Sequence, residues 1–227
     1  LPRTGDPGTD LGRNWRVMAE HLNVFESLFA QLADAERAPE AMVMRERIRQ
    51  WRFYDHFRSD RDAPARMTPL GTRTPVLSHD GGDLAAAWQT IVEIGDTSAL
   101  NAAVDDAFPT ASVRIDTSDG RFNLLFTQDG LLRPLSAAEL SDGTLRYLLW
   151  IAALHTPRPP PLMVLNEPET SLHPDLLPAL ARLIIRASQS CQVWVVSHAS
   201  RLIAALERDR RHEPREGDLL SMIRVSD

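Results

Sequence analysis

Two short apolar runs in the sequence each lead into a polar residue of the kind used in phosphate chemistry. Residues 162–165 are followed within two positions by Glu167, and residues 193–196 within two positions by His198. A carboxylate held at the tip of a buried strand can polarise a water molecule for attack on a phosphate. An imidazole at a neighbouring tip can hydrogen-bond to a phosphate oxygen or to that water. The two side chains are therefore candidates for one catalytic site.

A third segment, residues 140–144, opens a helix that is expected to continue through Leu154. Ser141 and Gly143 would present a hydroxyl group and free backbone N–H groups at the helix N-terminus, where the helix dipole favours an anion. The same Ser-Asp-Gly sequence is also typical of an ordinary N-cap or turn. Both interpretations stay open from the residues alone.

The elements around these residues predict how they are positioned. The apolar runs read as strands buried on both faces, and residues 175–188 between them read as a helix with one apolar side. Pro178 is unfavourable inside that helix and indicates a late start or a kink. A strand, helix and strand of this length form a right-handed parallel unit, in which ligands collect beyond the carboxyl ends of the strands. Glu167 and His198 are expected at that edge.

Upstream segments predict further helices and a hairpin. A stripe of apolar residues with helical spacing predicts an amphipathic helix over residues 14–34 that lies on a core. A second helix is expected to follow Pro39 and to run into residues 51–57, and a third to start at Asp83. Alternating apolar residues over 113–126, with glycines at the turns, predict an antiparallel hairpin or meander.

Composition limits the classes of protein. The chain has 227 residues, of which 43% are hydrophobic and 25% charged, which excludes a wholly disordered chain. All 25 basic residues are arginine, against 31 acidic residues, so the formal charge is −6 and a generally nucleic-acid-coating surface is not expected. The longest apolar run, Tyr147 to Leu154, is too short to span a bilayer. With the single Cys191, this predicts a cytoplasmic protein without internal disulfides.

The segment from Arg45 to Arg66 is rich in arginines interleaved with aromatic residues. This pattern would suit a surface that follows phosphates and stacks on bases, so DNA is a possible partner. In the other interpretation, which the usual burial of aromatic side chains favours, the arginines form a solvated or carboxylate-paired rim around core residues Trp51, Phe53, Tyr54 and Phe57.

Four motifs occur in the order that is typical of one family. Residues 140–144 resemble a signature motif, residues 162–167 a Walker B strand with its catalytic glutamate, residues 171–174 a D-loop, and residues 195–198 the switch histidine of an H-loop. The chain thus resembles the C-terminal lobe of an ABC-type ATPase head, in the branch of RecF-, SMC- and OLD-like AAA-family predicted ATPases. The resemblance is tight over residues 135–206.

The resemblance implies an α/β fold of the P-loop NTPase type, with a mostly parallel sheet core, an antiparallel hairpin and an added helical region. Residues 1–75 would form the helical, arginine- and aromatic-rich region with a linker, and residues 76–227 the ATPase lobe. The function implied is ATP binding and hydrolysis with Mg²⁺, coupled to DNA maintenance or defence. Two such heads would associate head to tail around ATP.

The resemblance also implies roles for single residues. Glu167 would be the general base and His198 the sensor of the phosphate, while Ser141 and Gly143 would contact the γ-phosphate on the opposite protomer. His173 would be a further contact to the nucleotide. Asn166 would help to hold Mg²⁺ through water.

Two departures from the family pattern affect the expected activity. Asn166 stands where an aspartate is usual, and an amide brings no negative charge, so the affinity for Mg²⁺ should fall. The phosphate-binding sequence G-x-x-x-x-G-K-[ST] is absent, and no cryptic version can exist because the chain contains no lysine. We therefore expect an N-terminal lobe with that loop outside this sequence. The alternative is a degenerate, non-hydrolysing module with a structural or regulatory role.

Overall fold

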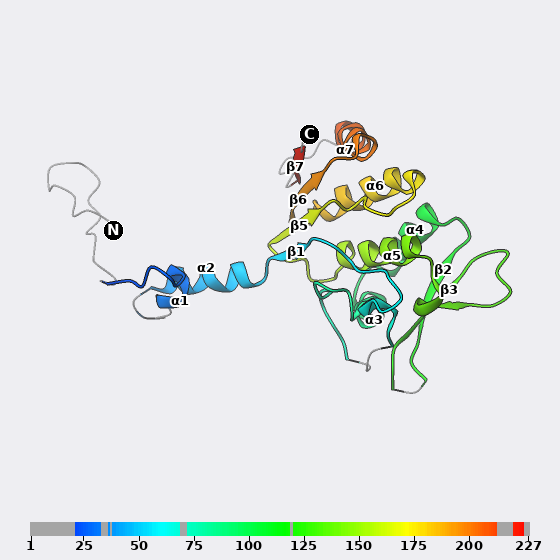
Figure 1. The fold of residues 1–227 in the computed structure, drawn as a ribbon, viewed down its shortest axis with the longest axis horizontal. Helices are drawn as coiled ribbons and strands as arrows, with labels where there is room; N and C mark the ends of the chain where they lie inside the picture. Colours follow the sequence, from blue (N-terminus) through cyan, green and yellow to red (C-terminus); the bar gives the residue numbers. More distant parts are fainter. Residues whose placement is uncertain are drawn as a thin grey trace. The chain divides into compact units, whose positions relative to one another are not determined.

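The computed structural model describes residues 21–32, 36, 38–68, 72–118, 120–212 and 220–224, and the chain forms two compact units. The N-terminal unit, Leu1–Trp51, contains helices α1 (Leu28–Gln31) and α2 (Pro39–Arg49). Neither helix has a buried residue. Within the described residues, the C-terminal unit, Arg52–Asp227, holds every strand and the other helices (Figure 1).

The prediction of a long amphipathic helix over residues 14–34 is wrong for residues 21–32, the part of this range that the structure describes. Of residues 21–32, only Leu28–Gln31 are helical, and Phe25 of the predicted apolar stripe is 93% exposed. The Asn23 side chain accepts a hydrogen bond from the Phe25 N–H at 3.0 Å, a local turn that competes with helical bonding. Residues 14–20 lie outside the described residues.

A parallel sheet forms the centre of the C-terminal unit. Its strand order is β1-β5-β6-β7, and every pair of neighbours is parallel. This confirms the predicted α/β class with a mostly parallel sheet. The bounds of the four strands are Arg52–Tyr54 (β1), Leu162–Asn166 (β5), Gln192–Ser197 (β6) and Leu220–Arg224 (β7).

Strand β1 corrects the prediction that the second helix runs into residues 51–57. Helix α2 ends at Arg49, and the chain then pairs with β5, because this buries Tyr54 to 1% exposure and lets its O–H group donate to the Leu77 carbonyl at 2.9 Å. Phe57 packs on Trp150 with ring centroids 4.8 Å apart. Along the sequence, the boundary between the two compact units falls between residues 51 and 52. The predicted functional boundary between residues 75 and 76 stays a prediction.

The predicted hairpin or meander is confirmed as a three-stranded antiparallel sheet. It consists of β2 (Ser112–Asp116), β3 (Asn123–Thr127) and β4 (Leu135–Ser136) in that order. Gly120 and Gly130, in the connections, have φ values of 67° and 90°. This left-handed conformation suits glycine and explains why glycines stand there.

Five α-helices and three short 3₁₀ turns, at Pro64–Arg66, Ala137–Glu139 and Pro174–Leu176, make up the rest of the described part of the C-terminal unit. Helix α5 is buried along nearly its whole length, and α6 starts late, with Pro178 in its first turn, as predicted. The sequence analysis did not predict α4, α7 or β7. The bounds of the helices are Leu84–Ile94 (α3), Thr97–Ala107 (α4), Asp142–Leu154 (α5), Leu177–Ala187 (α6) and Ser200–His212 (α7).

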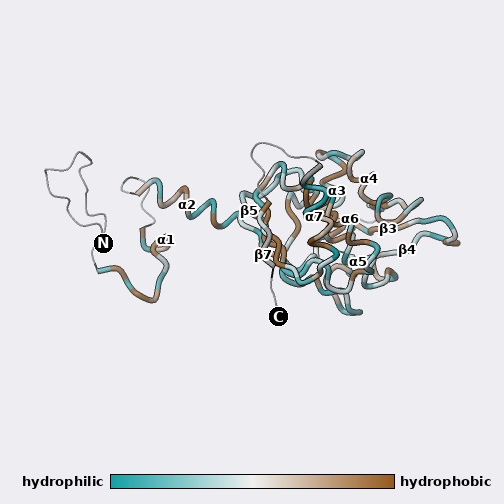
Figure 2. The backbone as a smooth tube through the Cα atoms, turned by 90° about the horizontal axis from the view of Figure 1, so that it is seen from above, coloured by the Kyte–Doolittle hydropathy of each residue, from teal (hydrophilic) through white to brown (hydrophobic). Residues whose placement is uncertain are grey.

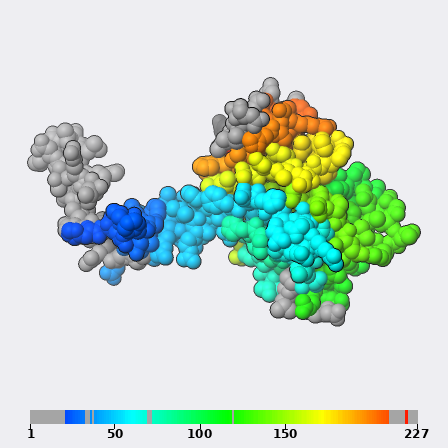
Figure 3. Space-filling view, viewed as in Figure 1, coloured from blue at the N-terminus to red at the C-terminus, as the bar shows by residue number. Residues whose placement is uncertain are grey.

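The described helices of the C-terminal unit cover one face of the parallel sheet and leave the other face without a helix of that unit. Helices α5, α6 and α7 lie on the same side of it (Figures 1 and 2), and α7 packs directly on α6 (Figure 3). Met163 and Val195 point into that core, whereas Phe53 and Trp194, in one register row across the sheet, are 50% and 39% exposed. We call the side with Phe53 and Trp194 the uncovered face. None of the described helices is long and apolar enough to cross a membrane.

Candidate functional site

Glu167 and His198 meet at the carboxyl ends of neighbouring strands, as the sequence predicts. Glu167 follows β5 directly, and its backbone N–H donates to the Val196 carbonyl of β6 at 2.8 Å. Its φ of 46° is unusual for a glutamate, and such strained backbone concentrates at functional sites. His198 Nε2 lies 3.0 Å from Glu167 Oε1. The two strand tips thus form one carboxylate–imidazole pair.

The Glu167–His198 pair is accessible from solvent. The side chains of Glu167 and His198 are 45% and 43% exposed. The hydroxyl group of Thr170 donates to Glu167 Oε2 at 3.4 Å, so each carboxylate oxygen has one protein partner. A carboxylate that keeps lone pairs toward solvent can accept a proton from a water molecule placed beside it.

Glu169 holds the loop that carries His198. Its Oε1 atom accepts three hydrogen bonds, from the Ser197 hydroxyl at 2.6 Å and from the N–H groups of His198 and Ala199 at 3.1 Å each. Its Oε2 atom is buried without a hydrogen-bond partner among the described residues. Glu169 therefore orients His198 through the backbone. The sequence analysis did not assign it a role, although it stands only two positions after Glu167.

Asn166 bonds to a carboxylate from the adjacent strand. Its side-chain amide donates to Asp55 Oδ1, and Asp55 directly follows β1. Asp55 thus places a negative charge beside the Asn166 amide. A carboxylate and an amide oxygen at one strand edge fit the Mg²⁺ that the family implies, because this ion is commonly held by one or two protein oxygens together with phosphates and water. A cluster of three or more metal-ligating side chains is absent from the described residues.

Ser141 and Gly143 stand at the N-terminus of α5. The Ser141 hydroxyl oxygen accepts from the Thr144 N–H at 3.1 Å, so the N-cap interpretation is confirmed, and the anion contact stays a prediction. A Cβ atom on Gly143 would lie 3.3 Å from the Ser171 carbonyl oxygen. This close approach explains the glycine and brings the turn against the loop that follows Glu167.

His173 lies apart from the pair. Its ring Nδ1 accepts from the Asp175 N–H at 3.3 Å and caps the 3₁₀ turn at Pro174–Leu176, and its side chain is 73% exposed. Among the described residues, no hydrogen bond or ion pair joins His173 to Glu167 or His198. A contact of His173 with the nucleotide stays a prediction.

The arginine-rich segment divides between structural and exposed residues. The core interpretation is confirmed for Tyr54 and Phe57, which are 1% and 2% exposed, whereas Phe53 is half exposed. Arg58 pairs with Asp60, and the side chain of Arg66 is 9% exposed and bonded inside the protein. The prediction of a DNA-binding face that extends from Arg45 to Arg66 is therefore wrong for Arg66, because its guanidinium is buried and cannot reach DNA.

Comparisons with known proteins identify the family of the chain. The family model described as "AAA domain, putative AbiEii toxin, Type IV TA system" matches residues 8–204. The chain belongs to this AAA domain family. The resemblance to an ABC/AAA-type ATPase head is thus confirmed, and the roles of Glu167 and His198 in this AAA domain stay predictions. No curated protein matches the sequence.

Solved structures of SMC heads are similar at low identity. The Smc head domain of Pyrococcus yayanosii is 16% identical with a TM-score of 0.44, and the match covers 52% of this chain and 24% of that one. A head domain from Pyrococcus furiosus is 15% identical with a TM-score of 0.44, over 52% of this AAA domain chain and 31% of that one. A structure from a study of "ATP-driven dimerization and DNA stimulated activation of SMC ATPases" is 16% identical with a TM-score of 0.43, over 54% and 77% of the two chains.

Proposed function

We propose that this chain is the part of an ATP-hydrolysing head that supplies the general base and the signature-like turn. The observation that carries the proposal is the 3.0 Å contact between Glu167 and His198 at the ends of β5 and β6. A carboxylate next to an imidazole, open to solvent at the carboxyl edge of a parallel sheet, suits the activation of water against a phosphate.

In this proposal Glu167 accepts the proton of the attacking water. His198 donates a hydrogen bond to Glu167 Oε1 and holds the carboxylate in one orientation, and Glu169 fixes His198 through its backbone. Mg²⁺ bound with ATP would offset the charge of the phosphates, and the oxygens of Asp55 and Asn166 would hold its water shell. Ser141 and Gly143 would face the γ-phosphate on a second head, so that two copies associate head to tail.

The phosphate-binding loop must come from outside the 227 residues in this proposal, since the chain contains no lysine. The uncovered face supports a further layer, because parallel sheets are normally covered on both faces. The chain alone should then bind ATP poorly, as the backbone N–H groups and lysine of that loop make the main contacts to the phosphates. Titration calorimetry that showed low-micromolar ATP binding by these residues alone would contradict this part.

A non-hydrolysing module is the second candidate, and the amide at Asn166 is the observation that favours it. Such a module would keep the fold and the partner surface and would lack turnover. Coupling to DNA maintenance or defence, and a cytoplasmic location, belong to either candidate as expectations from the family resemblance.

The test is Glu167→Gln in the full-length protein with its phosphate-binding loop. The substitution keeps the size of the side chain but removes the proton acceptor, so single-turnover hydrolysis should slow about a hundredfold or more. ATP binding should persist, and unhydrolysed ATP should hold the two heads together as a dimer in size-exclusion chromatography.

Glu40→Gln is the matched control, because Glu40 is an exposed residue in the first turn of α2, outside the C-terminal unit. It should hydrolyse ATP like the wild type. A Glu167→Gln protein with wild-type turnover would exclude Glu167 as the general base, and a wild type without any turnover would favour the non-hydrolysing module.

A further inference from the structure

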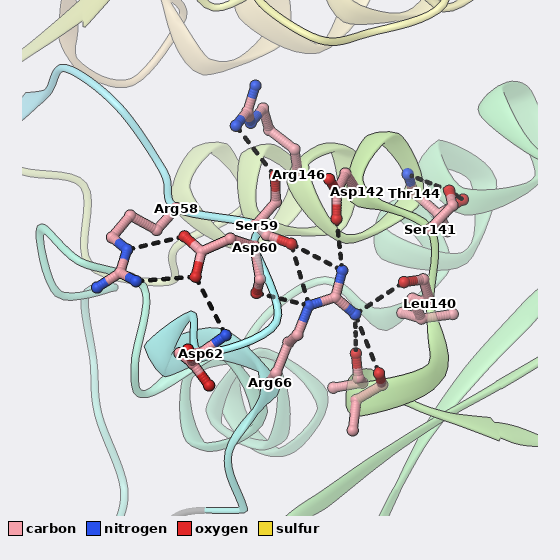
Figure 4. Close-up of polar contacts among 12 residues, drawn as sticks. Arg58, Ser59, Asp60, Asp62, Arg66, Leu140, Ser141, Asp142, Thr144 and Arg146 are labelled. Atoms are coloured by element: carbon pink, nitrogen blue, oxygen red, sulfur yellow. Dashed lines mark hydrogen bonds and ion pairs between the residues drawn. The ribbon is translucent and has the colours of Figure 1, made fainter.

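Two arginines connect the signature-like turn to the loop of the catalytic glutamate. Arg66 ends the 3₁₀ turn after β1, and its five guanidinium N–H groups make seven donor–acceptor contacts inside the protein, since some of them are shared between two acceptors (Figure 4). The acceptors are the carbonyl groups of Ser59, Asp60, Ala137, Ala138 and Leu140 and the carboxylate of Asp142, at 2.7 to 3.2 Å.

Arg66 thereby fixes the residues on both sides of Ser141. Its bonds to the Leu140 carbonyl at 2.8 Å and to Asp142 Oδ1 at 2.7 Å flank that N-cap directly. Only a guanidinium has five N–H donors in a rigid plane, so a lysine could not make the same set of bonds. The segment around Ser59 and the turn at the start of α5 are therefore held as one rigid piece.

Arg146 extends this connection toward the catalytic loop. It lies in the second turn of α5 and is 5% exposed, and it donates to the Ser59 hydroxyl at 3.1 Å and to the Thr170 carbonyl at 2.7 Å. Thr170 in turn donates to Glu167. The Nε atom of Arg146 is buried without a hydrogen-bond partner among the described residues. Burial also lowers the pKa of Arg146, so this side chain is placed at an energetic cost.

We infer that Arg66 and Arg146, joined through Ser59, are positioning residues that couple the signature-like turn at Ser141 to the loop of Glu167. We call Ser59, Arg66 and Arg146 the arginine bridge. A ligand that pulls on the turn would shift Arg66 and Ser59, then Arg146, and through the Thr170 carbonyl the loop of the general base. The inference deepens the proposed function, because it assigns this site a means of sensing the second head.

The bridge accounts for three features that fold stability alone leaves unexplained. The bonds from Arg66 to residues 137–142 and from Arg146 to Ser59 join segments 71 to 87 residues apart in sequence that share no strand pairing. It uses two nearly buried charges where apolar side chains would pack at a lower cost of desolvation. Its two ends are the two segments that the family motifs mark, the signature-like turn and the loop after the Walker B strand.

Ser59→Ala in the full-length protein is the sharpest test, because it removes one hydroxyl group and leaves the Ser59 carbonyl bonded to Arg66. Hydrogen–deuterium exchange should become faster in residues 167–172, and kcat should fall about tenfold with KM unchanged, the scale of a misplaced catalytic group. Ser112→Ala on the exposed edge of β2 is the matched control and should change neither. Arg146→Lys should show the same pattern as Ser59→Ala, and Arg66→Lys should also speed exchange in residues 140–144.

The two possible failures give different results. In the Glu167→Gln background, Ser59→Ala should not slow the residual hydrolysis further, because the bridge acts through Glu167. If Glu167→Gln alone keeps wild-type turnover, the proposed function fails, and faster exchange in residues 167–172 still tests the coupling. A folded Ser59→Ala protein with unchanged exchange in residues 167–172 and unchanged kcat would overturn the inference.

Discussion

Helices α2 and α6 have the same length of 11 residues, yet α6 buries seven of its residues and α2 none. In α6 the apolar residues recur at helical spacing and enter the core. In α2 the neighbouring residues Met42, Val43 and Met44 point in different directions and are 38%, 67% and 44% exposed. Helix α6 also has more apolar residues than α2, eight against five, so both their number and their spacing favour its burial.

The arginines of the two helices differ in the same way. Arg182 and Arg186 of α6 pair with Asp106 and Asp96, beside α4. Arg47 of α2 is exposed and makes no ion pair with a described residue. The C-terminal unit thus uses its arginines to connect its own segments, whereas the N-terminal unit presents at least one of them to solvent.

The largest effect is expected from truncating the core side of α6. Leu180 is fully buried, so Leu180→Ala should lower the free energy of unfolding by about 2–5 kcal/mol. Met44→Ala on α2 is the matched change and should stay within about 0.5 kcal/mol. Urea denaturation followed by circular dichroism measures both. Equal losses would show that α2 is packed in the protein as firmly as α6.

Limited proteolysis should distinguish the two helices next. Helix α2 lacks buried residues, so it should open locally at a low free energy, and trypsin should cut after Arg45, Arg47 or Arg49 first among the described arginines. Cleavage after Arg182 or Arg186 should be at least about tenfold slower. Mass spectrometry of timed digests gives the order, and early cleavage within α6 would contradict the comparison.

His155, the C-cap of α5, should make the stability of the C-terminal unit depend on pH. Burial, helped by the nearby Arg186 charge, lowers its pKa from 6.5 to about 4. The folded protein therefore resists protonation that the unfolded chain accepts. Above pH 6.5 His155 is neutral in both states and costs the folded protein little stability. From pH 7 to pH 5 the unfolding free energy should fall by about 2 kcal/mol because of this group. His155→Gln should remove that part of the slope in urea titrations, and an unchanged slope would exclude His155 as its source.

The smallest effect concerns DNA. If α2 is part of a binding surface, replacing Arg45 and Arg47 with glutamine should reduce the salt dependence of DNA affinity by about two in slope without changing the unfolding free energy. Arg133→Gln, whose guanidinium pairs with Glu139 in the C-terminal unit, is the control. Fluorescence anisotropy at several salt concentrations measures the slope. If the DNA affinity of the wild type does not depend on salt concentration, Arg45 and Arg47 do not contact DNA phosphates.

The sequence predicted the parts of the site that local pattern determines. The apolar runs identified β5 and β6, and their ends placed Glu167 and His198 together, because parallel strands end at one edge. It did not reveal partners brought in from far along the chain. Asp55 bonds to Asn166 across 111 positions, and Arg66 bonds to Asp142 across 76. Such contacts depend on strand order and loop packing, which no local spacing encodes.

The same limit explains the errors in the N-terminal part of the chain. Residues 51–57 read as a continuation of α2, but pairing with β5 overrides helical propensity when Tyr54 can be buried. The stripe over residues 14–34 matched a helix in spacing, yet its described part has an Asn23 turn instead. Periodicity predicts structure only where a core is present to receive the apolar side.

The uncovered face has a practical consequence for handling the protein. Phe53 and Trp194 lie in one row of a sheet whose edge strands, β1 and β7, each pair with a single neighbour in the described residues. Exposed aromatic side chains on the face of a sheet promote association between copies. Purified alone, these residues should tend to form soluble aggregates, and under the proposed function a co-expressed lobe that covers this face should disperse them. The emission of Trp194 should then shift to the blue as its indole leaves water.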